Sequence, residues 1–224
     1  MRVVKQKGYT MTVTSNEHTL SVQYLAPEDI STARSLIYQA YHDDPLLQNL
    51  LGYDQHNIAA YEKKLRSVIR EELSAFWQEK LPLIGLYRDD KLKAVACVFE
   101  SSSQLQPERY WHWRLKLMLS AGYLQTNQLI EKEQTIRTAL NEIGDYYYLA
   151  FIAVDPHVQG HGLGRYLLRG LDDLATKNTG AKGLAVFVTR QEHNTFFKSE
   201  GFSTYKALAF NKVSGELLFK PYAK

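Results

Sequence analysis

The sequence predicts one α/β domain built around a mixed β-sheet, and three observations lead to this class. Short β-rich runs alternate with amphipathic segments along the chain, as expected for helices packed on a sheet. The length of 224 residues suits one domain with an insertion. A hydrophobic fraction of 45% and a charged fraction of 23% are ordinary for a protein that forms a core. We expect residues 1–18 to be a flexible N-terminus and residues 19–224 a single domain.

The first part of the domain is expected to hold a strand, two helices and a hairpin. An alternating apolar and polar run predicts the strand. Pro27, followed by two acids, opens a helix, and the segment His42–Pro45 ends it. A second helix shows apolar side chains at helical spacing, and two apolar runs around a polar turn predict the hairpin. The expected ranges are 20–25 for the strand, 27–41 and 57–79 for the helices, and 82–87 and 92–99 for the hairpin.

The middle of the chain, at about 101–145, differs in character and is interpreted as a helical insertion. It begins with three serines and continues with two amphipathic segments, which predict helices at about 108–122 and 127–142. Its aromatic residues Tyr110, Trp111 and Trp113 either pack against the core or line a pocket, and the sequence leaves both alternatives open.

The last part of the chain alternates strands and helices and ends with two strands. A β-rich run is followed by a glycine-containing loop and a helix, and the same order of strand and helix recurs once more. The expected strands are 146–154, 184–188, 203–210 and 216–221, and the expected helices are 162–177 and 192–199.

Charge and cysteine content exclude several classes of protein. The net charge of +3 is accounted for by Arg2, Lys5 and Lys7, so the body of the domain is close to neutral and lacks the basic face of a nucleic-acid-binding protein. The single cysteine, Cys97, excludes an internal disulfide and lies in an apolar strand, which favours a buried, inert thiol. The chain shows no membrane span and no signal peptide. We expect a cytoplasmic protein with no nucleic-acid or membrane partner; the oligomeric state is open, a homodimer included.

The most informative segment is the loop between the strand at 146–154 and the next helix. Three glycines, Gly160, Gly162 and Gly164, follow Pro156 and precede the helix start. Glycine lets the backbone approach a ligand closely. The start of a helix offers unpaired N–H groups and a partial positive charge. This combination favours binding of a phosphate group.

Two familiar phosphate-binding patterns do not fit this loop. A P-loop requires Lys-Ser/Thr after its last glycine, whereas Arg165-Tyr166 follows here. The dinucleotide fingerprint requires G-x-G-x-x-G, whereas these glycines follow a G-x-G-x-G spacing. A tight turn with no ligand is the remaining structural alternative.

The loop does resemble the acetyl-CoA loop of the GNAT acetyltransferase superfamily. The family core Gln/Arg-x-x-Gly-x-Gly/Ala is matched by Gln159, Gly162 and Gly164. The segment Asn194–Phe202 is similar to the C-terminal Asn…Phe-Tyr-x-x-x-Gly-Phe segment of that family, and the order of elements is similar as well. The resemblance implies a GNAT-like mixed, mostly antiparallel central sheet flanked by helices.

The resemblance also implies acetyl-CoA as co-substrate, with no metal. In such a fold the strands at 146–154 and 184–188 splay apart, and the pantetheine arm pairs with backbone groups in the gap. The amides of residues 160–165 would hold the pyrophosphate. The residues that the resemblance implies for this site are Ile152, Ala153, Val154, Gln159, Gly160, His161, Gly162, Leu163, Gly164, Arg165, Asn194 and Phe197.

The catalytic groups are less clear from the sequence. An alkylamine has a pKa of about 10.4, so acyl transfer to it requires a base, and a backbone N–H near Val154 would stabilise the negative charge that develops on the thioester oxygen. The tyrosine that often donates a proton in the family is replaced here by Phe197. Tyr205 and Tyr147 are alternative donors and Glu100 is an alternative base; the sequence assigns none of them.

The sequence therefore predicts an N-acetyltransferase that transfers acetyl from acetyl-CoA to a primary amine by direct attack, with a small-molecule amine as acceptor. Two alternatives remain: a CoA-binding sensor or interaction module without turnover, suggested by Phe197, and an acyltransferase for longer chains, suggested by the aromatic insertion. Residues 27–55 and 101–145 are expected to select the acceptor. Within them, the acidic run His42–Asp44 is a candidate for attracting a cationic amine, with a surface helix end as the alternative.

Overall fold

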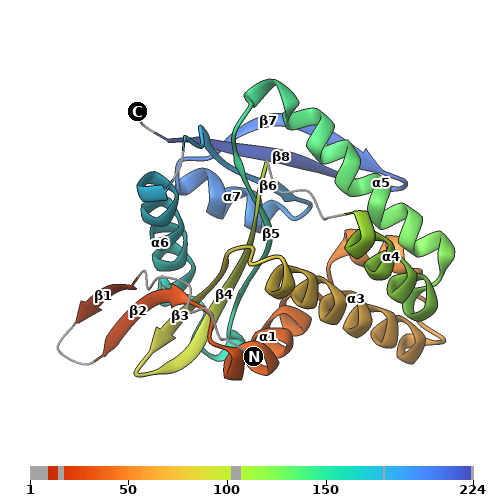
Figure 1. Cartoon of the computed structure of the whole chain (residues 1–224), viewed down its shortest axis with the longest axis horizontal. Coiled ribbons are helices and arrows are strands. Elements are labelled where there is room, and N and C mark those ends of the chain that lie inside the picture. The colour runs from red at the N-terminus through yellow and green to blue at the C-terminus, as the bar shows by residue number, and fades with distance from the viewer. Residues whose placement is uncertain (1–9, 15–17, 102–106, 179, 223–224) are drawn as a thin grey trace.

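The fold is an eight-stranded sheet with helices on both faces (Figure 1). The computed structural model describes residues 10–14, 18–101, 107–178 and 180–222. The strands are β1 (Thr10–Thr14), β2 (Thr19–Tyr24), β3 (Leu83–Arg88), β4 (Lys91–Glu100), β5 (Tyr147–Val154), β6 (Gly183–Val188), β7 (Ser203–Phe210) and β8 (Val213–Pro221). Their order is β1-β2-β3-β4-β5-β6-β8-β7, and all neighbouring strands are antiparallel except β5 and β6. The predicted mixed, mostly antiparallel sheet is confirmed.

Helices occupy the ranges that the sequence pattern indicates, with one addition. They are α1 (Ile30–Tyr41), α2 (Pro45–Leu51), α3 (Ile58–Gln78), α4 (Pro107–Ala121), α5 (Tyr123–Leu140), α6 (Leu163–Asn178) and α7 (Gln191–Ser199), with 3₁₀ turns at Pro27–Asp29, Asn141–Ile143 and Pro156–Val158. The prediction missed α2. Asp44 and Pro45 end one helix and start the next, because the Asp44 side chain accepts the Leu47 N–H at 2.8 Å and proline fits the first helical position.

The segment 1–18, predicted to be flexible, contains a strand. β1 pairs with β2 in antiparallel register, from Thr10 opposite Gln23 to Thr14 opposite Thr19. The rest of that segment, apart from residue 18, lies outside the described residues.

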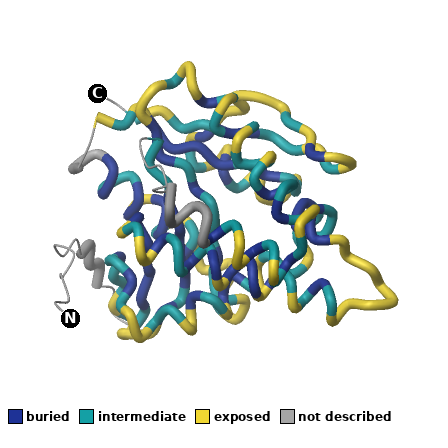
Figure 2. The backbone as a smooth tube through the Cα atoms, turned by 45° about the vertical axis from the view of Figure 1, so that its right-hand side comes forward, coloured by how far each residue is buried: buried dark blue, intermediate teal, exposed yellow. Residues whose placement is uncertain are grey.

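The sheet separates two cores on opposite faces. The first, which we call the α6-side core, joins α6 to apolar side chains of β2 to β6. The second, the α3-side core, contains buried residues of α1 to α5 (Figures 1 and 2). Along β5 the side chains of Tyr147 and Leu149 join the first core, and Tyr148 joins the second, as the period of two in a strand requires.

Two irregularities interrupt this alternation at the centre of the sheet. β5 and β6 pair in parallel over only three residues each, Tyr147–Leu149 and Leu184–Val186, although both strands run further. In addition, a bulge in the β4–β5 ladder leaves Ala150 between the paired positions, so that Ala150 and Phe151 both pack on the α3-side core. The strands therefore separate beyond Leu149, which is the splay that the family resemblance implies.

Candidate active site

A cavity of about 650 Å³ occupies the gap between β5 and β6. Its lining includes Leu163, Phe196 and Phe197 on the side of the α6-side core. It also includes Phe151 and Trp113, which pack in the α3-side core. The cavity therefore passes through the sheet. Two reactants can approach a shared point from opposite faces, which is the arrangement that a direct transfer between them needs.

The glycine loop forms the mouth of the cavity on the α6 side. Gly160 and Gly162 have φ angles of 80° and 76°, which L side chains adopt rarely. A Cβ atom added to either glycine would meet no atom within 4 Å, so the loop backbone faces open space next to the start of α6 at Leu163. An amide-lined space at a helix start fits a pyrophosphate. Gly164 differs, because its Cβ would lie 3.3 Å from the Phe196 ring.

Ten of the twelve residues predicted for the acetyl-CoA site line this cavity. They are Ile152, Ala153, Val154, Gln159, Gly160, Gly162, Leu163, Gly164, Arg165 and Phe197. The Gln159 side chain donates to the Val154 carbonyl at 3.1 Å and so fixes the start of the loop against β5. The Arg165 Nε donates to Glu200 at 2.5 Å, so this arginine is already paired.

The other two predicted residues lie outside the lining. The His161 ring contacts the Gln159 carbonyl at 3.0 Å and is exposed. Asn194 is buried, and its side chain hydrogen-bonds the Glu216 carboxylate rather than facing the cavity.

The weak catalytic candidates from the sequence also lie away from the cavity lining. Tyr147 is buried in the α6-side core, Tyr205 is exposed on the edge strand β7, and Glu100 ends β4. Of the insertion aromatics, Trp113 lines the cavity, and the side chains of Tyr110 and Trp111 lie outside the described residues.

A hydroxyl group that the prediction missed lies in the gap. The Ile152 N–H donates to the Tyr41 hydroxyl oxygen at 3.1 Å, and the Tyr41 ring packs edge-on against Phe151 at 5.1 Å. Burial raises the pKa of Tyr41, so the hydroxyl keeps its proton at all ordinary pH values. The available signal was helical spacing, since Tyr41 follows the buried Ala33 and Ile37 at intervals of four.

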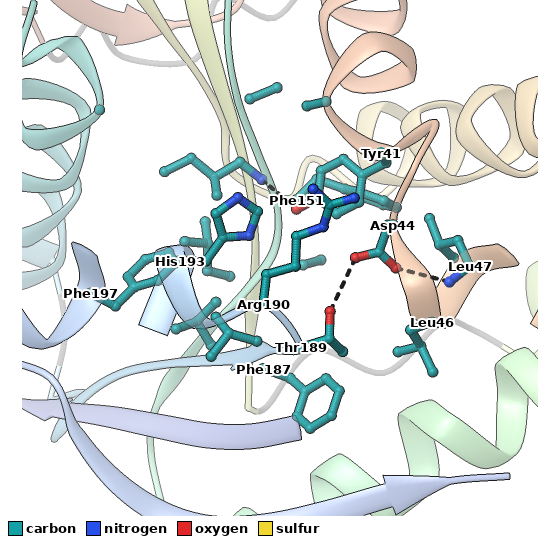
Figure 3. A pocket seen from close by; sticks show the side chains of 18 of the residues that line it. Tyr41, Asp44, Leu46, Leu47, Phe151, Phe187, Thr189, Arg190, His193 and Phe197 are labelled. Atoms are coloured by element: carbon teal, nitrogen blue, oxygen red, sulfur yellow. Dashed lines mark hydrogen bonds between the residues drawn. The ribbon is translucent and has the colours of Figure 1, made fainter. Parts of the chain in front are cut away.

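Polar side chains from the residue before α2, from the segment between β6 and α7, and from α7 form the rim of the cavity (Figure 3). The Thr189 hydroxyl donates to Asp44 at 3.4 Å, and the Arg190 guanidinium donates to the Asp43 carbonyl. These bonds tie the α1–α2 connection to the end of β6. Desolvation lowers the pKa of His193, which leaves this rim imidazole neutral at pH 7.

The part of the cavity lined by α3, α4 and α5, which we call the inner chamber, contains the Glu72 carboxyl. Burial, followed by the nearby Glu133 carboxylate, raises the pKa of Glu72 from its ordinary 4.5 to about 8. Lys132 and a hydrogen bond with the Trp113 side chain act in the opposite direction. Periodicity alone could not distinguish Glu72 from the other charged residues of its helix.

This carboxyl is expected to make the stability of the protein depend on pH. Because the pKa of Glu72 is raised in the folded state, its ionisation does not affect the free energy of unfolding below pH 4.5. The free energy of unfolding falls as the pH rises from 4.5 to 8, and the loss is constant above pH 8. Glu72→Gln is therefore expected to raise the free energy of unfolding by a few kcal/mol, roughly, at pH 9 and to leave it nearly unchanged at pH 4. Urea unfolding at both pH values measures the difference, and an equal effect at both would contradict the prediction.

Comparisons with known proteins agree with the fold and the glycine loop. Residues 126–204 match the sequence model of the acetyltransferase (GNAT) domain. A probable serine/threonine-protein kinase from Dictyostelium discoideum is 25% identical over 202 residues, covering 84% of this chain and 21% of that protein. The chain thus spans about a fifth of the length of this curated relative.

Solved structures show the same fold at low identity. One, described as histone acetyltransferase HPA2 and related acetyltransferase, comes from Corynebacterium glutamicum. It has a TM-score of 0.62, is 14% identical, and covers 91% of this chain and 96% of its own. The PaiA N-acetyltransferase of Thermoplasma acidophilum, solved in complex with coenzyme A, has a TM-score of 0.52. It is 14% identical and covers 91% of this chain and 99% of its own.

The fold is the one seen in these solved acetyltransferases, and the segment matched by the acetyltransferase (GNAT) domain model contains the glycine loop. The resemblance to the GNAT acetyltransferase superfamily found in the sequence agrees with the domain model matched by residues 126–204 and with the fold of the solved structures. Across the described residues, no helix combines the length and hydropathy needed to cross a membrane. Within the same residues, no three His, Cys, Asp or Glu side chains are grouped so as to hold a metal ion.

Proposed function

We propose that this protein is an N-acyltransferase that transfers acetyl from acetyl-CoA to a primary amine by direct attack. The observation that carries the proposal is the cavity that crosses the sheet, with a glycine cradle at one mouth and the inner chamber at the other. The donor would approach from the α6 side and the amine from the α3 side. A cavity of about 650 Å³ is of the size that small-molecule ligands occupy, so we propose a small-molecule acceptor. We place the reaction in the cytoplasm, where the donor is available.

The residues of the chain would supply binding, positioning and proton transfer. Amides of residues 160–165 would hold the pyrophosphate, and the edge of β5 that β6 leaves unpaired beyond Leu149 would pair with the pantetheine arm. The Val154 N–H would stabilise negative charge on the thioester oxygen. As the C–N bond forms and the C–S bond breaks, the Tyr41 hydroxyl would give its proton to the departing sulfur, the role that Phe197 cannot fill.

Radiolabelled acetyl-CoA, incubated with the protein and a panel of primary amines, tests this function, with calorimetry on CoA as a separate measurement. We expect micromolar to millimolar CoA binding and transfer of the label to at least one amine. CoA binding without label transfer would favour the sensor alternative, whereas absence of CoA binding at millimolar concentration would exclude both.

A further inference from the structure

The walls of the inner chamber determine what kind of acceptor it can hold. Val68 of α3, Leu129 of α5 and Phe99 of β4 line it, and Leu46 and Leu47 of α2 close it toward the rim. These five side chains are aliphatic or aromatic, and Glu72, Lys132 and Glu133 add polar groups to the lining. A ligand body that fills the chamber gains free energy mainly from the burial of apolar surface.

Glu72 presents an acid group in these apolar surroundings. It lies one helical turn after Val68, so both side chains project from the same face of α3 into the cavity. The titratable groups around it are Cys97 of β4 and Lys132 and Glu133 of α5, and the Trp113 side chain of α4 hydrogen-bonds it.

The neighbours do not neutralise this carboxyl fully. Glu133 is paired with Arg137 at 2.9 Å, and Lys132 is the cation that acts on Glu72. Cys97, which also feels the Glu72 charge, pairs in register with Phe151 at the point where the sheet opens. Glu72 lines the cavity from α3, on the side of the sheet from which the amine would approach.

We propose that the inner chamber binds a small primary amine with an apolar body, and that Glu72 is the general base that takes a proton from its ammonium group. This inference rests on the proposed function. The nitrogen loses two protons in all. Glu72 takes the first proton and releases it to water after turnover. The second proton passes to the Tyr41 oxygen and replaces the proton that Tyr41 gives to sulfur. The freed lone pair forms the C–N bond as the C–S bond breaks.

The protonation behaviour of Glu72 suits this role. A base works best when its pKa lies near the working pH, because it is then both available and strong enough. Transfer from an alkylammonium group is far less uphill to a carboxylate with a raised pKa than to an ordinary glutamate. A carboxyl strongly perturbed by burial within a cavity is also a general indication of a functional site.

The test compares Glu72→Gln with the control Glu71→Gln, using benzylamine and acetyl-CoA as probes. Glu71 is the adjacent carboxylate, but it pairs with Arg70 and Lys116 outside the cavity lining. We expect Glu72→Gln to lower kcat/KM for benzylamine about 100-fold at pH 7. The deficit should shrink toward pH 10, where the amine loses its proton unaided. Glu71→Gln should leave kcat/KM for benzylamine unchanged at pH 7 and at pH 10. Ethanolamine lacks an apolar body and should show, with the wild type, a kcat/KM at least about tenfold lower than that of benzylamine.

A second variant leaves Glu72 in place and tests its role as a base through its pKa. Lys132→Met removes the cation that lowers the pKa of Glu72, so the acid limb of the pH profile should move to higher pH. If the acid limb of the Lys132→Met pH profile does not move, Glu72 is not the general base. The same conclusion follows if Glu72→Gln lowers kcat/KM by the same factor at pH 7 and pH 10. Wild type that binds CoA but acetylates no apolar amine, or that prefers hexanoyl-CoA to acetyl-CoA, overturns the chamber assignment. Absence of CoA binding overturns the proposed function itself.

Discussion

Replacing Gly162 by valine is expected to weaken CoA binding about 100-fold, which corresponds to about 2.7 kcal/mol. Two effects add. A β-branched residue at a φ of 76° is strained, at a cost of about 1–2 kcal/mol. The new side chain would also fill the open space above the loop, where a Cβ meets no protein atom within 4 Å. That space is where we place the pyrophosphate. Calorimetric titration with CoA measures the change.

The matched control is Gly52→Val. Gly52 has a φ of 71°, and a Cβ there has no neighbour closer than 3.9 Å, so the strain is similar. It ends α2, away from the lining of the cavity. We expect this variant to lose comparable thermal stability and to bind CoA like the wild type. If both variants bind CoA with unchanged affinity, the loop is not the phosphate cradle and the proposed function fails.

The fold was predictable because its signals are local. Apolar periodicity predicted the helices and strands, and the residues that indicate phosphate binding in the glycine loop lie within six positions of one another. The one helix that was missed shows the limit of such signals. Asp44 and Pro45 favour both the end of one helix and the start of another, and the sequence alone does not say which.

The site was only half predictable, for a different physical reason. Its donor side comes from one continuous segment, whereas its acceptor side is assembled by tertiary packing. Tyr41 meets Ile152 across 111 positions of sequence, and Glu72 meets Lys132 across two helices that only the fold brings together. Asn194 shows the converse, since a residue that matches the family motif is drawn to Glu216 by the local hydrogen-bond network. Motif matching therefore locates the loop well and the chemistry poorly.

Tyr41→Phe is the second change with a large expected effect, and it should lower kcat about 100-fold while leaving CoA affinity within about threefold of the wild type. The hydroxyl accepts the Ile152 N–H, so its own proton is free to point into the gap. Burial keeps that proton in place at neutral pH. Loss of the hydroxyl removes the donor for the leaving sulfur without altering the glycine loop. Steady-state kinetics with saturating acetyl-CoA, together with calorimetry, separates the two effects.

Tyr61→Phe is the control for the structural part of this change. The Tyr61 hydroxyl donates to the His42 carbonyl at 2.8 Å, and the residue is fully buried but outside the cavity lining. Both variants leave a part-buried backbone group without its partner, which costs up to about 1–3 kcal/mol, so both should lower the melting temperature. Only Tyr41→Phe should lower kcat. Phe197→Tyr, introduced into the Tyr41→Phe variant, places a hydroxyl at the position the family often uses and should restore part of the rate. A Tyr41→Phe protein with wild-type kcat would show that the sulfur leaves without a proton from this residue.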